Sequence, residues 1–327
     1  MVSVRLTNGV QFDAEANESI LDAGRRNGVI LEYSCRTARC GSCMVRVQTG
    51  ETRALMDEQA LLENQIAEGW VLSCARAAVS DVVLETEDLG RLASVQVKTL
   101  PCRIDALTQP APDILQVVLR LPSATEFVYL PGQYINVIVQ SGVRRSYSLA
   151  NAPRPDRKLE LHIRAVPGGE LSDYWFATAK INDLLRLEGP FGTFCRREKF
   201  GKIIFLVTGT GFAPAKAMLE ELMSLPQQDR PPAWLYWGGR HVSDIYHTVN
   251  FPGLDLHYVP VLSWADSQWM GRRGHVQEAA LQDHVDFSDA VVYACGSDAM
   301  IHAAREKLVL AGLPYANFHS DAFVASN

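Results

Sequence analysis

The sequence predicts a multidomain protein of mixed α+β and α/β class, because three segments with different patterns follow one another. Residues 1–90 hold closely spaced cysteines among short strands, residues 97–197 alternate strands with turns, and residues 200–327 alternate strands with helices. The chain has 327 residues, of which 47% are hydrophobic and 21% charged. Each segment is therefore able to bury a core of its own.

The acidity of the chain lies in its first segment. Residues 1–90 contain 14 acidic and 8 basic side chains, which account for the whole net charge of −6. No basic stripe is present, which argues against nucleic acid as a partner. A solvated acidic face is sufficient to explain this charge, and a docking surface for a protein with a basic patch is the alternative.

The start of the chain, MVSVRLTNGVQF, lacks a basic stretch followed by an apolar one, and no apolar run approaches the length of a membrane span. We therefore expect a cytoplasmic protein that does not enter a membrane. Seven cysteines in such a chain favour metal ligation or buried thiols over a disulfide framework.

Four of these cysteines have a diagnostic spacing. Cys35, Cys40 and Cys43 form C-x4-C-x2-C within EYSCRTARCGSC, and Cys74 follows in VLSCAR. Structural zinc sites usually bring two C-x2-C pairs, whereas one is present, and a Rieske centre needs two histidines, which the first segment lacks. The spacing is that of a plant-type [2Fe–2S] cluster, and we predict these four cysteines as its ligands.

The sequence around the cysteines predicts a small β-rich module. VSVRLTNGVQFDAE predicts a hairpin across Asn8-Gly9, SILDAGRRNGV predicts a short helix, and CMVRVQTG and DVVLETED predict further strands. Over residues 1–90 this pattern resembles the β-grasp fold of plant-type ferredoxins.

A second motif lies in RRSYS, where Arg145, Tyr147 and Ser148 match R-x-Y-S. The motif resembles that of the ferredoxin–NADP reductase superfamily, which implies an antiparallel β-barrel that binds FAD over residues 97–197. In that family role Tyr147 would face the flavin ring, Ser148 would bond near flavin N5, and Arg145 would pair with the pyrophosphate. A half-buried strand is the alternative for these residues taken alone.

HIRAVPGGELS is similar to the second pyrophosphate cradle of the same superfamily, because a glycine pair precedes a helix N-terminus. The candidate FAD-binding residues there are His162, Arg164, Gly168, Gly169 and Ser172. LEGPFGTF then resembles the turn with which such barrels close.

The last segment opens with KIIFLVTGTGFAPAKAMLEELMSL, which predicts a buried strand, a glycine-rich turn and an amphipathic helix. This is the first unit of a Rossmann-like parallel sheet for NAD. Gly209, Thr210, Gly211 and Pro214 retain most of the family pattern G-G-T-G-x-x-P, in which Thr208 replaces the first glycine.

Two pieces near the C-terminus complete the predicted catalytic set of Ser148, Cys295 and Phe323. CGSDAM, with Cys295 and Gly296, resembles the segment beside the nicotinamide ring in this superfamily. Phe323 resembles the aromatic residue that covers the flavin until nicotinamide displaces it. A core thiol and a packed terminal side chain are the structural alternatives.

The order of ferredoxin, flavin barrel and nicotinamide domain resembles the reductase components of bacterial aromatic-ring dioxygenases and related oxygenases along the whole chain. VQVKTLPCRIDAL, RRSYSLANAP, YACGSDAMI and FHSDAFVASN are still more similar to the CDP-6-deoxy-Δ3,4-glucoseen reductases, which donate electrons in dideoxysugar synthesis. The resemblance implies an enzyme that takes hydride from NADH onto FAD and passes single electrons through the [2Fe–2S] cluster.

The resemblance leaves the electron acceptor between two classes. The closer branch implies a pyridoxamine-phosphate-dependent CDP-6-deoxy-hexulose 3-dehydrase, and the broader one implies a Rieske, diiron or haem (P450) oxygenase component. A redox-sensing adaptor without fast hydride transfer is the third hypothesis. The glycines expected at a nicotinamide site are retained, and an adaptor without hydride transfer would have little need of them.

The segment after the second predicted strand of the last domain favours NADH over NADPH. GGRHVSDIY offers one cation, Arg240, together with Asp244, whose negative charge would repel a 2′-phosphate. We expect a higher kcat/KM for NADH than for NADPH in steady-state ferricyanide reduction, and a smaller difference in Asp244→Asn. Equal or better use of NADPH by the unaltered protein would contradict this preference.

Overall fold

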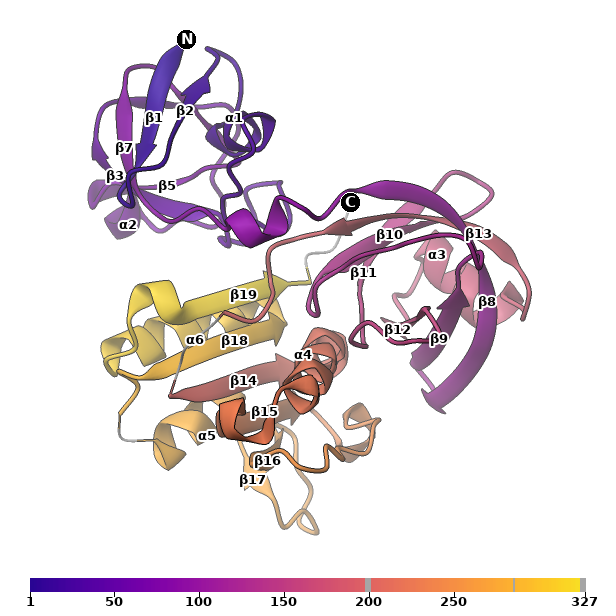
Figure 1. Cartoon of the computed structure of the whole chain (residues 1–327). Coiled ribbons are helices and arrows are strands. Elements are labelled where there is room, and N and C mark those ends of the chain that lie inside the picture. The colour runs from indigo at the N-terminus through magenta and orange to yellow at the C-terminus, as the bar shows by residue number, and fades with distance from the viewer. Residues whose placement is uncertain (198–200, 285, 324–327) are drawn as a thin grey trace. The chain divides into compact units, whose positions relative to one another are not determined.

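The computed structural model describes residues 1–197, 201–284 and 286–323. The described chain forms two compact units, one with residues 1–96 and 192–194 and the other with residues 97–191 and 195–323 (Figure 1). The first residue of the third predicted segment, residue 200, and its last residues, 324–327, lie outside the described part, so this part of the prediction has no structural account.

The first unit is built on a five-stranded sheet in the order β2-β1-β7-β3-β5, beside the two-stranded sheet β4-β6. Its elements are β1 (Val2–Leu6), β2 (Gln11–Ala14), α1 (Ile20–Arg26), β3 (Met44–Thr49), β4 (Thr52–Ala54), α2 (Glu63–Ala67), β5 (Trp70–Leu72), β6 (Arg76–Ala78) and β7 (Val82–Glu85). β1 and β2 pair antiparallel, which confirms the hairpin predicted at Asn8-Gly9, and β1 pairs parallel with β7.

Local sequence explains the single longer helix of this unit. The hydroxyl of Ser19 accepts a hydrogen bond from Asp22 N at 3.1 Å and caps the start of α1. Ile20, Leu21 and Ala23 are buried against the sheet, and the chain leaves the helix at Asn27. The predicted helix is confirmed, and its end delivers the chain to the cysteine loop.

The second unit begins with an antiparallel sheet of six strands in the order β11-β10-β13-β8-β9-β12. A bridge between Leu149, just after β11, and Leu161, in the middle of β12, closes the sheet on itself as a barrel. Its elements are β8 (Lys98–Ala111), β9 (Ile114–Arg120), β10 (Tyr134–Ile138), β11 (Arg144–Ser148), β12 (Lys158–Arg164), α3 (Glu170–Asp173) and β13 (Leu184–Phe191).

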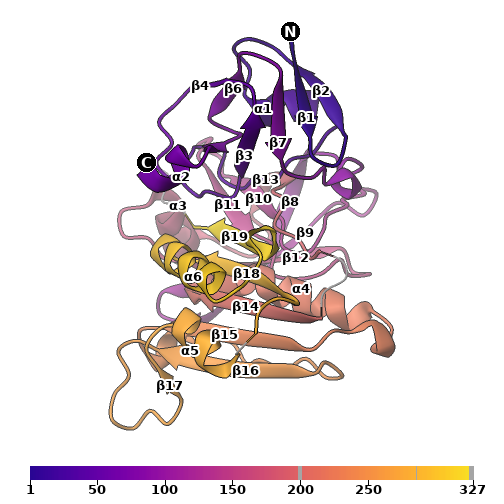
Figure 2. The same cartoon turned by 90° about the vertical axis from the view of Figure 1, so that its left-hand side faces the viewer.

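The rest of the second unit is a parallel sheet in the order β17-β16-β15-β14-β18-β19. Its elements are β14 (Lys202–Thr208), α4 (Phe212–Ser224), β15 (Ala233–Gly239), β16 (Leu256–Leu262), β17 (Arg272–Arg273), α5 (Val276–Asp283), β18 (Ala290–Gly296), α6 (Asp298–Leu310) and β19 (Phe318–Ala322). Figure 2 shows α5 and α6 in front of this sheet. Strand order reverses beside β14, which places the ligand crevice at the carboxyl ends of β14 and β18.

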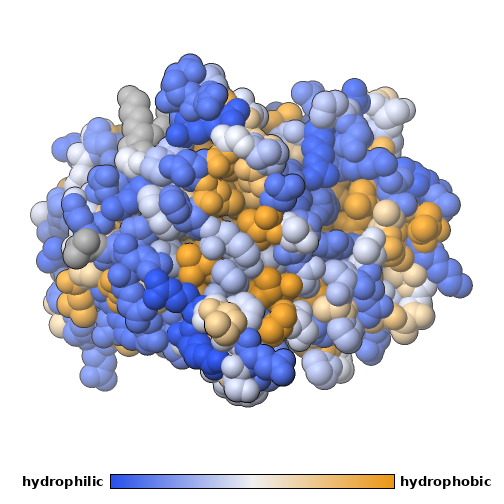
Figure 3. Space-filling model, turned by 90° about the horizontal axis from the view of Figure 1, so that it is seen from below, coloured by the Kyte–Doolittle hydropathy of each residue, from blue (hydrophilic) through white to orange (hydrophobic). Residues whose placement is uncertain are grey.

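None of the helices within the described residues has the length and apolar character that a bilayer crossing requires. On the face drawn in Figure 3, hydrophobic residues form separate patches among hydrophilic ones.

Two glycines of the first unit provide a test of its backbone. Gly50 and Gly9 both have left-handed φ values, +90° and +91°, but only Gly50 lies against backbone: an added Cβ would be 2.1 Å from Asp81 O, and at Gly9 it would meet nothing within 4 Å. Gly9→Ala should therefore lower the free energy of unfolding by about 1 kcal/mol through the backbone penalty alone. Gly50→Ala should lower the free energy of unfolding by about 3 kcal/mol or more, because the backbone at residue 81 must also move.

The measurement is urea unfolding of both variants, followed through the visible absorbance of the predicted cluster in this unit. Equal losses for the two alanines would contradict the close approach of residues 50 and 81.

Candidate functional site

The four predicted cluster cysteines lie together in the first unit. Cys40, Cys43 and Cys74 are buried and Cys35 is half-buried, and none forms a disulfide. The loop between Cys35 and Cys43 winds tightly, because Arg36, Ala38 and Gly41 all have positive φ values of 59°, 59° and 72°. Such a backbone turns N–H groups inward. Thr37 N lies 3.3 Å from Cys35 Sγ and Cys35 N lies 3.5 Å from Cys40 Sγ.

The sulfur atoms form two pairs. Cys43 Sγ lies 3.2 Å from Cys74 Sγ, and Cys40 donates a hydrogen bond to Cys35. That hydrogen bond lowers the pKa of Cys35 to about 5, and the equivalent bond from Cys43 lowers the pKa of Cys74. Four thiolates this close together repel one another, so their binding as ligands requires the positive charge of metal ions.

This arrangement fits a two-iron cluster. Two sulfur pairs suit a [2Fe–2S] cluster, in which four cysteines are divided between two irons. The inward N–H groups of the loop would stabilise the negative charge on the cluster sulfurs.

The R-x-Y-S residues lie on β11, at the end of the barrel where the strand meets its closing bridge. The hydroxyl of Tyr147 accepts a hydrogen bond of 3.0 Å from the indole N–H of Trp175, and their rings meet edge to face. Burial raises the pKa of Tyr147 to about 12, so this hydroxyl stays protonated. Arg145 donates to the Arg144 carbonyl at 2.8 Å, and Ser148 is buried. The strand thus presents an aromatic ring held in one orientation.

The second predicted pyrophosphate site is the glycine turn at Gly168 and Gly169, which leads into α3. Gly168 has φ +72°, and a Cβ there would meet nothing within 4 Å, so the turn borders open space. Ser172 Oγ accepts a hydrogen bond from Val166 N at 2.9 Å, which braces the turn and leaves its O–H available to donate. Gly169 is the N-cap of α3. A glycine turn that borders open space, with a hydroxyl able to donate, is suited to a pyrophosphate.

His162, one of the predicted FAD-binding residues, contacts protein groups through both ring nitrogens. Its Nδ1 is 2.8 Å from the Tyr246 hydroxyl and its Nε2 is 2.9 Å from Glu160 Oε1, so both ring nitrogens are engaged. Burial lowers the pKa of His162, and the ring stays neutral at pH 7. The imidazole therefore joins β12 of the barrel to Tyr246 of the parallel-sheet domain.

His162 belongs to a group of titratable side chains on the side of α4 that faces the barrel. We call this group the junction cluster. The buried ammonium of Lys216 lies 3.0 Å from Glu160 Oε2, 2.8 Å from Glu220 Oε1 and 2.9 Å from the Ala150 carbonyl. Burial would raise the pKa of Glu160, but the hydrogen bond from His162 and the charge of Lys216 lower it to about 2. The members of the cluster are Arg154, Glu160, His162, Lys216 and Glu220.

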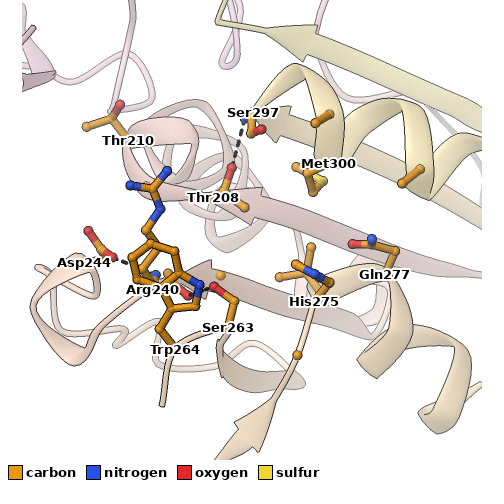
Figure 4. Close-up of a pocket in the computed structure, with 18 of the residues that line it drawn as sticks. Thr208, Thr210, Arg240, Asp244, Ser263, Trp264, His275, Gln277, Ser297 and Met300 are labelled. Carbon is orange, nitrogen blue, oxygen red and sulfur yellow. Dashed lines mark hydrogen bonds between the residues drawn. The ribbon is translucent and has the colours of Figure 1, made fainter. Parts of the chain in front are cut away.

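A cavity of about 850 Å³ opens at the carboxyl ends of the parallel strands (Figure 4). Its lining includes Thr208 from the end of β14, Gly239 from β15, Ser263 after β16 and Gly296 from β18. This is the crevice expected at the switch point of a doubly wound sheet, and its volume is suited to a dinucleotide.

The two loops that form the floor of the cavity meet too closely for side chains. A Cβ at Gly211 would lie 2.2 Å from Cys295 O, and one at Gly296 would lie 2.4 Å from Thr208 Oγ1. Thr208 Oγ1 accepts a hydrogen bond from Ser297 N at 2.9 Å. The threonine that replaces the first glycine of the family pattern therefore ties the β14 turn to the start of α6 (Figure 4).

Arg164, also expected at the FAD site, reaches into this cavity. Its Nη1 lies 3.2 Å from the position of a Cβ on Gly209, directly over the glycine-rich turn. Its Nη2 lies 2.8 Å from Asp244 Oδ1, and its Nε lies 3.3 Å from Asp113 Oδ2. A guanidinium at this place is suited to a pyrophosphate that lies on the turn.

Asp244 is already bound on both oxygens. Its Oδ2 accepts hydrogen bonds from Arg240 N at 2.7 Å and His241 N at 3.1 Å, and its Oδ1 accepts from Arg164. Burial would raise its pKa, but these donors lower it below the ordinary value. The charge that was expected to repel a 2′-phosphate is therefore largely compensated within the protein.

Two features of the cavity escaped the sequence analysis. The guanidinium of Arg240 lies 5.1 Å from the ring centre of Trp264, and the pair forms one wall. Across the cavity, Gln277 is 4% exposed, and its Oε1 has no hydrogen-bond partner among the described residues. Figure 4 shows Gln277 beside His275 on the far side from Trp264. The aromatic ring of Trp264 beside a guanidinium is suited to stacking of an adenine ring.

Two of the three predicted catalytic residues, Ser148 and Cys295, lie beside Asp321. The hydroxyl of Ser148 lies 3.4 Å from Asp321 Oδ2, and Cys295 on β18 is the register partner of Asp321 on β19. Phe323 N donates to Gly296 O at 3.0 Å, and its half-exposed ring lines the cavity. Burial raises the pKa of Cys295, so it is a neutral thiol. The sequence analysis missed Asp321, which only the register of β19 brings to this place.

Comparison with known proteins gives three family matches that divide the chain in the same order. A 2Fe-2S iron-sulfur cluster binding domain matches residues 5–79, an oxidoreductase FAD-binding domain matches residues 101–195, and an oxidoreductase NAD-binding domain matches residues 205–306. The first match contains the four cysteines, the second the R-x-Y-S strand, and the third the glycine-rich turn.

Relatives match over nearly the whole chain. The chain is 42% identical to the CDP-6-deoxy-L-threo-D-glycero-4-hexulose-3-dehydrase reductase of Yersinia pseudotuberculosis, over 98% of this chain and 97% of the relative. It is 30% identical to reductase component 2 of terephthalate 1,2-dioxygenase from Comamonas sp, over 96% and 94%. A solved cytochrome P450 reductase from Amycolatopsis superposes with a TM-score of 0.73 at 28% identity, and the match covers 100% of both chains.

The fold and these matches define an NADH-dependent oxidoreductase of the ferredoxin reductase type, with FAD, a [2Fe–2S] cluster and a protein electron acceptor. The predicted fold class and cofactors are thereby confirmed. The chain belongs to the family of the CDP-6-deoxy-L-threo-D-glycero-4-hexulose-3-dehydrase reductases.

The Trp264 platform provides a test of the nucleotide cavity. Stacking of a base on an aromatic side chain contributes about 1–3 kcal/mol, so Trp264→Ala should raise the Kd for NAD⁺ by about tenfold or more. The measurement is difference absorbance of the flavin on titration with NAD⁺. Met270→Ala is the matched control, because Met270 lies in the same loop, is 95% exposed and does not line the cavity. An unchanged Kd in Trp264→Ala would place the adenine elsewhere.

Proposed function

We propose that this reductase delivers electrons from NADH, one at a time, to the pyridoxamine-phosphate-dependent CDP-6-deoxy-hexulose 3-dehydrase of dideoxysugar synthesis. The observation that carries the proposal is the 42% identity, over 98% of the chain, to a reductase named for that dehydrase. The oxygenase reductase from Comamonas is 30% identical. An oxygenase component is therefore the second candidate acceptor.

The proposed roles follow the three segments predicted from the sequence, residues 1–90, 97–197 and 200–327. Cys35 and Cys40 would hold one iron of the cluster, and Cys43 and Cys74 the other, since the sulfurs already lie in those pairs. When bound, the nicotinamide supplies a hydride, the flavin accepts the electron pair, and the cluster carries electrons singly.

The chain's own residues would orient these groups. Tyr147, held by Trp175, would lie against one face of the flavin, and Ser148 would form a hydrogen bond at its reacting edge. Phe323 would cover the other face and exclude water when no nicotinamide is bound. The neutral thiol of Cys295 borders this site without adding charge.

Nucleotide binding would use the floor and walls of the cavity. Gly209 and Gly211 let the pyrophosphate approach the backbone, and Arg164 neutralises its charge from the barrel side. Arg240 and Trp264 would hold the adenosine half. Because Asp244 is occupied as a cap, we propose that it acts on cofactor choice through the position of Arg164 and the backbone at residue 240.

The test of the acceptor is an anaerobic reconstitution of the purified reductase with the dehydrase, its sugar nucleotide substrate and NADH. NADH oxidation in step with loss of the sugar hydroxyl would support the proposal. Transfer to a Rieske oxygenase component, with none to the dehydrase, would replace it with the second candidate. A flavin that NADH fails to bleach would overturn both and favour the redox-sensing adaptor.

The order of carriers has its own test. Cys74→Ser removes one ligand of the cluster, so NADH-driven reduction of cytochrome c should fall by about 100-fold, to background, while ferricyanide reduction at the flavin stays within about twofold. Cys102→Ala is the matched control, because Cys102 is a buried cysteine of the barrel outside the cluster loop. Loss of ferricyanide reduction in Cys74→Ser would show that electrons leave by another route or that the cluster holds the protein folded.

A further inference from the structure

A second cavity lies at one end of the antiparallel barrel, and we call it the barrel cavity. Its volume is about 440 Å³, and its described lining shares no residue with the nucleotide cavity. Three pieces of chain surround it: residues 121–129 after β9, residues 153–157 after β11, and the start of β12. None of the residues assigned above to the cluster, FAD or NADH is in this described lining. The cavity is large enough for a small organic molecule.

The walls of the barrel cavity combine apolar surface with positive charge. Phe127 and Tyr129 lie on one wall with their ring centres 5.9 Å apart, and buried Leu159 lies at the start of β12. The charged residues in the described lining are three cations and one exposed carboxylate: Arg154, Arg157, Lys158 and Glu126. Such walls are suited to a molecule that has an apolar body and a negative group.

Arg157 differs from the other two cations in its partners. Arg154 Nη2 lies 2.8 Å from Glu220 Oε1, and Lys158 Nζ lies 2.7 Å from Asp105 Oδ2, so carboxylates of the protein already compensate both charges. Within the described chain Arg157 forms no ion pair, and its Nη1 donates to the neutral carbonyl of Ser123 at 2.6 Å. A guanidinium carries five N–H donors and binds a carboxylate or phosphate through two of them. Arg157 therefore has donors and charge left for a ligand.

The backbone of Arg157 adopts a conformation that favours glycine or asparagine. Its φ is +56°, in the left-handed region, and its N–H closes a turn by donating to Arg154 O at 3.0 Å. This turn carries the side chain from the loop after β11 to Ser123 in the loop after β9. Backbone strain of this kind is concentrated at ligand-binding positions, where the placement of one side chain matters.

Hydrogen bonds fix the loop after β11 without any ligand. Ala152 N donates to Glu220 Oε2 of α4 at 3.0 Å, and Asn151 Nδ2 donates to Lys158 O at 3.1 Å. The Tyr129 hydroxyl donates to Asn151 O at 3.0 Å, which joins this loop to the loop after β9. The barrel cavity is therefore preformed, and a ligand would not have to order its walls.

We propose that the barrel cavity is a binding site for a small organic acid, a carboxylate or phosphate carried on an apolar body about the size of one or two rings. Arg157 binds the negative group, and Phe127, Tyr129 and Leu159 contact the apolar body. This site is additional to the proposed electron transfer, because no carrier of that reaction is assigned to it. It is also independent of which protein accepts the electrons.

The probe is anilinonaphthalene sulfonate, an aromatic anion whose fluorescence rises in apolar sites. It is titrated into the cofactor-loaded protein in the presence of saturating NAD⁺, so that the nucleotide cavity is filled. Phenylnaphthylamine, which has the same rings without the sulfonate, is titrated in parallel. The measured quantity is the Kd of each probe, and NADH-driven ferricyanide reduction reports whether each variant is folded.

Two variants alter the barrel cavity. Arg157→Gln removes its uncompensated cation, and Ala124→Trp fills it from an exposed position of the lining. The matched controls lie outside the described lining: Arg186→Gln changes an exposed arginine of β13, and Val128→Trp changes a residue of the same loop as Ala124 that is 51% exposed.

Arg157→Gln should raise the Kd of the sulfonate by about tenfold or more and that of the neutral probe by less than about twofold, because only the sulfonate loses a charged hydrogen bond. Ala124→Trp should raise the Kd of both probes by about tenfold or more. Both controls should match the wild type, and all four variants should keep ferricyanide reduction within about twofold.

An unchanged sulfonate Kd in both cavity variants would overturn the proposal. Absence of sulfonate binding once NAD⁺ is saturating would do the same, because the probe would then occupy only the nucleotide cavity. Equal weakening of the charged and neutral probes in Arg157→Gln would overturn the assignment to an anion. Failure of the proposed electron transfer is separate from these results, since it appears as a flavin that NADH does not reduce.

Discussion

The second unit depends on a buried ammonium placed between two carboxylates. Lys216 of α4 reaches Glu160 on β12 and Glu220 on its own helix, and only 6% of its surface is exposed. Removing one partner from such a group would leave an uncompensated charge in a dry environment, which costs far more than the pair contributes. These ion pairs join the barrel to the parallel-sheet domain. In that arrangement Ser148 of the barrel lies beside Asp321 of the parallel sheet.

The first unit depends on a different physical constraint, the close approach of its four cysteines. Its cysteine loop adopts strained left-handed conformations at Arg36 and Ala38, and this winding brings buried sulfurs into two close pairs. Four thiolates there need the charge of metal ions, so the loop and its cluster are interdependent.

Much of this could be predicted because the determinants are local in sequence. The cysteine spacing, the R-x-Y-S strand and the glycines at 209 and 211 each encode one turn or strand, and the structure places them in such elements. Other features depend on strands that are distant in sequence. The pairing of β18 with β19 brings Asp321 to Cys295, and the packing of β12 against the parallel-sheet domain brings His162 to Tyr246. No pattern within either segment specifies those contacts.

The ion pair between Arg164 and Asp244 has a consequence for any change of cofactor preference, whether engineered or natural. Arg164 belongs to the barrel and Asp244 to the loop after β15, so the residue proposed to act on cofactor choice also joins the barrel to the parallel-sheet domain. A substitution at Asp244 would therefore remove a partner of the Arg164 guanidinium as well. Under the proposed roles, the choice of coenzyme and the position of Arg164 would change together.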